Sequence, residues 1–153
     1  KPPSAKFQLL GAIGSENRTS IGATEVEAWV AEGVVDYLGT TKDVRPFIEG
    51  ASCIVLPSYR EGAPRTLIEA AAMARPVITT DVPGCRSVLD PKISGYLCEP
   101  RSAHSLAKSI EQFLSLCDSA QAEMGLAGRR KMASEFDQTI VVKAYRSAIA
   151  SIF

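Results

Sequence analysis

Residues 53–80 read CIVLPSYREGAPRTLIEAAAMARPVITT, with two apolar runs on either side of a helical segment. Cys53–Pro57 and Val77–Thr80 are short, partly β-branched runs, a composition that favours buried strands. Leu67–Met73 is rich in strong helix formers. Parallel strands need a crossover connection, usually a helix, so this stretch predicts a strand, a turn, a helix and a second, parallel strand.

The turn between this first strand and its helix carries two acids. Ligands of open α/β proteins bind beyond the carboxyl ends of parallel strands, where this turn lies. Glu61 is in the turn and Glu69 is about one turn into the helix, so both carboxylates can face one crevice several ångströms apart. Gly62 and Ala63 add little side-chain bulk between them.

The start of this helix suits an anion. Pro64 has the fixed backbone angle and the missing donor that fit the first turn of a helix. The backbone N–H groups after it, near Arg65 and Thr66, are free to hold a phosphate. Carboxylates beside an anion site suit a sugar nucleotide, with its phosphates at the helix start and its hydroxyls at the acids.

The composition is that of one soluble domain. The 153 residues are 46% hydrophobic and 22% charged, with a formal net charge of zero. This balance argues against nucleic-acid binding, and no apolar run approaches the roughly 20 residues of a membrane span. The four cysteines are spread without the close pairs of a zinc or redox site, which favours reduced thiols in the cytoplasm. The lone His104 has no companion ligands, so we expect a surface or capping role.

The rest of the chain alternates strands and helices. We expect one doubly wound, Rossmann-like α/β domain over residues 1–153, with a parallel sheet and a helical C-terminal tail. The abrupt start in a strand suggests a fragment of a larger protein. Strands are predicted at 7–11, 34–39 and 95–98, and helices at 21–32, 44–50, from 102 onwards, and in two parts after 120, with Asp43 and Asp137 as caps.

The segments EGAPRTLIEA (61–70) and PVITTDVPG (76–84) resemble the donor-binding half of retaining glycosyltransferases of the two-domain GT-B fold, family 4 (group 1). That family has two glutamates separated by seven residues, as Glu61 and Glu69 are. The resemblance extends over almost the whole chain, because residues 35–39, 55–58 and 95–100 also look like strands of that family.

The resemblance implies a role for each matching position. Glu61 would orient the donor sugar as the catalytic residue, and Glu69 would bind the ribose of the nucleotide. The loops Gly11–Asn17 and Gly39–Asp43 would border the base. The implied substrate is a nucleotide diphosphate sugar, most simply a UDP-sugar, transferred with retention and without a metal or other cofactor. The substrate-binding backbone between the acids would comprise Gly62, Ala63, Pro64, Arg65, Thr66 and Leu67.

Departures from the family limit what we expect of this chain alone. The first strand and basic loop of the usual domain are missing, and so is the amino-terminal half that binds the acceptor sugar or lipid-linked sugar. We therefore expect no transferase activity from this fragment alone. Ala74 stands where the family usually has a glycine at the end of the helix. Family members that build bacterial surface polysaccharides have similar sequence segments, which suggests the same pathway. We expect the full-length protein to contact the membrane only peripherally.

Other interpretations of the same residues stay open. Thr66 and Glu69 also fit a capping box, in which the glutamate returns a hydrogen bond to the helix start. Glu61 fits an exposed loop acid, and Arg86 a surface charge. At the level of function, the alternatives are a nucleotide-sugar 2-epimerase of the same fold, for which no acid and base set can be located, and a non-catalytic nucleotide-binding module.

Overall fold

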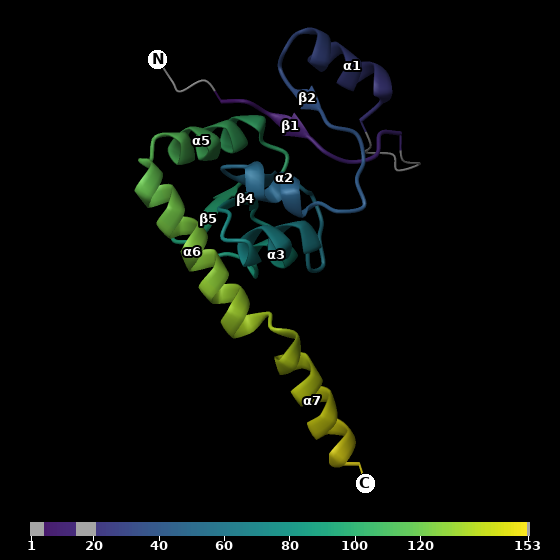
Figure 1. Ribbon diagram of the computed structural model, residues 1–153, viewed down its shortest axis with the longest axis vertical. Helices are drawn as coiled ribbons and strands as arrows, with labels where there is room; N and C mark the ends of the chain where they lie inside the picture. Colours follow the sequence, from purple (N-terminus) through teal and green to yellow (C-terminus); the bar gives the residue numbers. More distant parts are fainter. Residues whose placement is uncertain (1–4, 15–20, 153) are drawn as a thin grey trace. The chain divides into compact units, whose positions relative to one another are not determined.

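The computed structural model describes residues 5–14 and 21–152, which fall into two compact units (Figure 1). The first unit ends at Arg45 and the second begins at Pro46. Strands pair in parallel within each unit, and helices connect them. The predicted Rossmann-like α/β class with a helical C-terminal tail is therefore confirmed.

The described residues of the first unit form a two-stranded parallel sheet and one helix between its strands. Strands β1 (Gln8–Leu9) and β2 (Asp36–Tyr37) flank helix α1 (Ala23–Ala31). Both strands are shorter than predicted, and after β2 the chain turns at Gly39, whose φ is 72°. The amide of Gly11 donates to the carbonyl of Gly39 at 2.9 Å, which ties the two strand-end loops together. Residues 15–17 of the predicted Gly11–Asn17 loop lie outside the described residues.

The second unit is built on a three-stranded parallel sheet with β4 in the middle. Strands β3 (Ile54–Leu56), β4 (Val77–Thr80) and β5 (Gly95–Cys98) pair in the order β3-β4-β5. Every residue of β4 is buried, as expected for a parallel strand that is covered on both faces. Helix α3 (Arg65–Ala72) connects β3 to β4, which confirms the strand, turn, helix and strand predicted from residues 53–80.

Two of the remaining helices begin at the caps predicted for them, Asp43 and Asp137. Helix α2 (Arg45–Gly50) starts where the Asp43 carboxylate accepts from the Arg45 amide at 3.1 Å. Ser102 caps α5 (Ala103–Leu114), and His104 is exposed on its first turn. Helix α5 packs on the sheet through a core of Ile78, Phe113 and Met124. The last residue of that core lies on α6 (Asp118–Glu135), and α7 (Gln138–Ala150) follows after the predicted break, capped by Asp137.

The end of α3 shows how the chain accommodates an alanine where a glycine is usual. Ala74 has a left-handed φ of 57°. The Ala74 amide donates to the Ala71 carbonyl at 3.0 Å, and the Arg75 amide donates to the Ala70 carbonyl at 2.9 Å. These two bonds form a Schellman turn, which requires the left-handed residue. Helix α6 reaches this turn at Gly125, where a β-carbon would overlap the carbonyl oxygen of Ala74.

We expect Ala74→Gly to stabilise the protein by about 1 kcal/mol, because it removes the left-handed penalty of an alanine at a small cost in unfolded-state entropy. Thermal and urea unfolding measure this difference. Ala72→Gly, in the exposed last turn of α3, is the matched control, and we expect it to lower stability by up to about 1 kcal/mol. Destabilisation by both variants would contradict the strain at Ala74.

Candidate functional site

The predicted site lies in residues 57–64, which leave the carboxyl end of β3 and enter α3. Glu61 is half-buried, Gly62 and Ala63 are exposed, and Pro64 is buried. Pro64 takes an extended conformation and is the N-cap, so α3 begins at Arg65, one residue later than predicted. Among the described residues, the Glu61 side chain has no hydrogen-bond or ion-pair partner, so its carboxylate is available to a ligand.

The start of α3 presents free backbone donors. The Pro64 carbonyl accepts from the amides of Leu67 at 3.1 Å and Ile68 at 3.2 Å, which closes the first turn. No acceptor within the described residues takes the amides of Arg65 and Thr66, and both residues are exposed. Unpaired N–H groups at a helix start attract anions, because they carry the positive end of the helix dipole. The structure therefore leaves unpaired the two amides that the sequence predicts for an anion, and the binding of an anion to them stays a prediction.

Glu69 lies one turn into α3 and is half-buried. Its Oε1 atom is 3.5 Å from Nη2 of Arg65, and the guanidinium side of this pair is 89% exposed. An exposed ion pair of this kind contributes little to stability, so the Glu69 carboxylate can exchange it for a ligand hydroxyl. The capping-box interpretation is wrong: Thr66 is the second helical residue, and the helix start has no side-chain cap bond.

Residues of β4 and of the segment after it contact the backbone of residues 58–62. These contacts were not predicted from the sequence. The buried hydroxyl of Thr79 donates to the Leu56 carbonyl at 2.7 Å, and that of Thr80 donates to the Ser58 carbonyl. At Gly84, a β-carbon would overlap the carbonyl oxygens of Glu61 and Gly62. The only signal in the sequence is a glycine after a proline, a pair that also marks ordinary turns.

Residues 81–86 follow the carboxyl end of β4. Pro83–Arg86 form the short helix α4, with Val82 as its N-cap and the proline at the first helical position. A proline there costs no hydrogen bond, and its fixed backbone angle suits the helix. Arg86, interpreted as a possible surface charge, pairs with Asp81 at 2.6 Å. Helix α4 places Gly84 against the backbone of residues 58–62, here called the site loop.

The strand-end loops of the first unit were expected to border the base. Gly11–Gly14 and Gly39–Asp43 do follow the carboxyl ends of β1 and β2, and the Tyr37 hydroxyl donates to the Gly11 carbonyl at 2.8 Å. Their contact with a nucleotide base stays a prediction.

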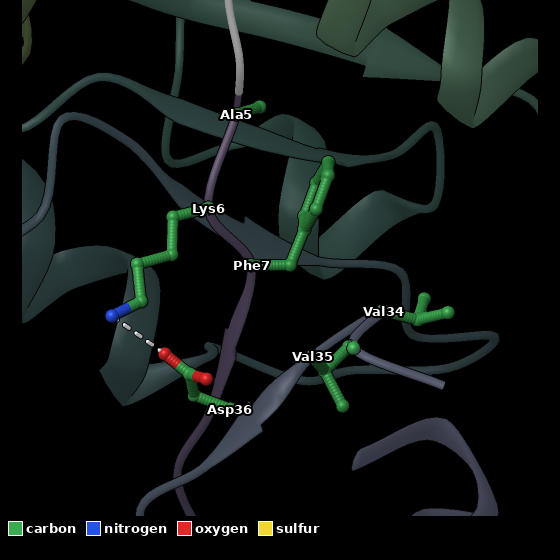
Figure 2. A pocket seen from close by; sticks show the side chains of 7 residues that line it. Ala5, Lys6, Phe7, Val34, Val35 and Asp36 are labelled. Carbon is green, nitrogen blue, oxygen red and sulfur yellow. Dashed lines mark ion pairs between the residues drawn. The ribbon is translucent and has the colours of Figure 1, made fainter. Parts of the chain in front are cut away.

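A hollow of about 280 Å³ in the first unit lies at the other end of these strands (Figure 2). Its lining residues precede or begin β1 and β2, and an ion pair of 2.8 Å joins Lys6 to Asp36 across it. Because ligands of α/β sheets bind at carboxyl ends, this hollow is not the expected nucleotide site. The lining residues are Ala5, Lys6, Phe7, Gly33, Val34, Val35 and Asp36.

The described residues contain no group of three or more His, Cys, Asp or Glu side chains that could hold a metal ion. All four cysteines are free thiols. Desolvation raises the pKa of Cys53 to about 12, so this thiol stays protonated at neutral pH. Cys117 is exposed, and a hydrogen bond from the Ser119 hydroxyl lowers its pKa. Within the described residues, no helix is long and apolar enough to cross a membrane.

The known proteins that the chain is similar to are named as sugar transferases. The chain is 27% identical over 142 residues to N,N'-diacetylbacillosaminyl-diphospho-undecaprenol alpha-1,3-N-acetylgalactosaminyltransferase of Campylobacter jejuni, covering 92% of this chain and 36% of the relative. It is 44% identical over 70 residues to the putative teichuronic acid biosynthesis glycosyltransferase TuaC of Bacillus subtilis, covering 46% of this chain and 18% of the relative. The chain thus spans only about a third of the first relative's length and less of the second's.

Solved structures show the same fold. Sucrose-phosphate synthase from Thermosynechococcus elongatus matches 95% of this chain and 39% of its own, with a TM-score of 0.78 and 26% identity. HepE from Anabaena in complex with UDP matches 98% of this chain and 42% of its own, with a TM-score of 0.85 and 18% identity. The family model described as glycosyl transferases group 1 matches residues 2–116, and the chain belongs to this family.

Proposed function

We propose that this chain is the donor-binding part of a retaining glycosyltransferase that uses a nucleotide diphosphate sugar, with UDP-sugar as the first choice. The observation that carries the proposal is the start of α3, where the unpaired amides of residues 65 and 66 lie in the chain between two half-buried acids, Glu61 and Glu69. Structures of the same fold support the choice of nucleotide, since HepE from Anabaena and TarM from Staphylococcus aureus were solved with UDP.

The proposed roles follow the chemistry of each group. The amides of Arg65 and Thr66 would bind the diphosphate, whose negative charge matches the helix dipole. Glu69 would accept hydrogen bonds from the ribose hydroxyls, in place of its exposed contact with Arg65. Glu61 would hold the hydroxyls of the donor sugar and orient its anomeric carbon. The backbone from Gly62 to Leu67 would lie along the diphosphate and sugar. No metal or other cofactor is part of the proposal.

The acceptor and the pathway are proposed from relatives. The Campylobacter relative is named for transfer to a diphospho-undecaprenol-linked sugar, and other relatives are named for capsular polysaccharide and colanic acid biosynthesis. We propose an acceptor of this class, a sugar or lipid-linked sugar of bacterial surface polysaccharide assembly. It would bind parts of the full-length protein outside this chain, because the relatives are much longer than the chain.

A nucleotide titration of the full-length protein tests the donor site. We expect UDP to bind, and we expect Glu69→Ala to weaken it by about 10-fold or more, because a charged hydrogen bond to the ribose is lost. Calorimetry with UDP, GDP and UDP-N-acetylhexosamines measures the affinities and identifies the base. Glu123→Ala, an exposed acid on α6, is the matched control and should bind like the wild type. Equal affinity of the Glu69 variant and the wild type would contradict the ribose contact.

A further inference from the structure

A cation–π contact joins the site loop to the turn after β5. The guanidinium carbon of Arg101 lies 5.3 Å from the centre of the Tyr59 ring, within the range of an attractive contact. Tyr59 is two residues before Glu61 in the loop after β3, and its side chain is 54% exposed. Arg101 comes from the turn that leads from β5 to α5. The contact therefore connects the carboxyl ends of the two outer strands of the sheet.

The backbone around Arg101 is fixed in an unusual conformation. Arg101 has a left-handed φ of 60°, which is uncommon for a residue with a side chain. The residues on both sides are hydrogen-bonded: the Glu99 amide donates to the Ser105 hydroxyl at 2.9 Å, and the Ser105 amide donates to the Ser102 hydroxyl at 3.1 Å. A strained residue persists only where its surroundings hold it, so the turn presents the guanidinium from a defined position.

The site loop lacks such internal support. Among the described residues, the amides of residues 59–63 donate no backbone hydrogen bond. The loop is held from β4 through the Ser58 carbonyl and from α4 through the carbonyls of Glu61 and Gly62. These contacts reach the two ends of the loop segment 58–62 and leave its middle unsupported. The Arg101 contact falls on that middle part, at Tyr59.

We propose that Arg101 is a positioning residue that acts through the Tyr59 ring to fix the site loop, and with it the orientation of Glu61. The inference rests on the proposed transferase function for its effect on turnover, and on the geometry alone for its effect on the loop. Arg101 is not placed in contact with the donor.

Limited trypsin digestion of the full-length protein measures how firmly the site loop is held, because Arg60 provides a cleavage site inside this loop. We expect Arg101→Ala to raise the rate of cleavage after Arg60 by about two- to five-fold, the range supplied by an exposed cation–π contact. Tyr59→Leu should raise it equally, and the double variant should add nothing further. Arg101→Lys and Tyr59→Phe keep the cation and the ring and should retain most of the protection.

Turnover is the second readout. We expect Arg101→Ala to lower kcat by about two- to five-fold with little change in KM, the pattern of an interaction that orients the reacting groups. Arg130→Ala, an exposed arginine on α6, should change neither measurement. Unchanged cleavage after Arg60 in both Arg101→Ala and Tyr59→Leu would overturn the contact, and raised cleavage with unchanged kcat would overturn the positioning role. Failure of the proposed function itself would appear separately, as a wild-type protein without transferase activity.

Discussion

Glu61→Ala is expected to reduce sugar transfer by the full-length protein by about 100-fold or more while the protein stays folded. The proposed role of Glu61 is to orient the donor sugar, and misplacing a reacting group by about 1 Å can cost 10²-fold in rate. The side chain is half-buried in the loop after β3 and makes no polar contact with another described residue. Its removal should therefore cost little stability and much activity.

The measurement is a steady-state assay with a UDP-sugar and an acceptor, together with a thermal melt of each variant. Glu61→Gln, which keeps the size but not the charge, should fall between the wild type and the alanine variant. Glu49→Ala removes an exposed carboxylate at the end of α2 and should leave the rate unchanged. Turnover of Glu61→Ala at the wild-type rate would refute the catalytic role and favour a non-catalytic nucleotide-binding module.

The sequence predicted the elements of the second unit well, because the signals there are local. Residues 53–80 contain apolar runs and helix formers whose order favours a parallel pair of strands with a crossover helix. The caps at Asp43 and Asp137 were also predictable, since each accepts from the backbone amide two residues later. The two acids at 61 and 69 could be placed at the start of a helix for the same reason.

The contacts that hold the site loop could not be predicted, because they join residues far apart in the chain. Neither the approach of Gly84 to the loop carbonyls nor the contact between Tyr59 and Arg101 leaves a periodic pattern in the sequence. The sequence shows that position 84 is a glycine, and several turn types would explain that residue. Only the structure shows that the missing β-carbon is needed for close packing.

Gly84→Ala is therefore expected to displace the site loop, although residue 84 lies outside that loop. The new β-carbon would overlap the carbonyl oxygens of Glu61 and Gly62, both of which are backbone atoms that no side-chain rotation can move away. Either α4 or the loop must shift, and overpacking of this kind costs about 1–3 kcal/mol. Because Thr80 holds the Ser58 end of the loop, we expect the shift to fall on the Glu61 end.

Two measurements separate a loss of stability from a displacement of the site loop. Urea unfolding gives the first, and kcat measured well below the melting temperature gives the second, which we expect to fall by about 10-fold or more. Gly50→Ala is the matched control, because a β-carbon there meets no atom within 4 Å and should leave turnover unchanged. A Gly84→Ala protein with lowered stability but normal kcat would show that the loop tolerates displacement, and Gly84 would then be needed only for folding. A fall in both would show that α4 positions the site loop as well as packing against it.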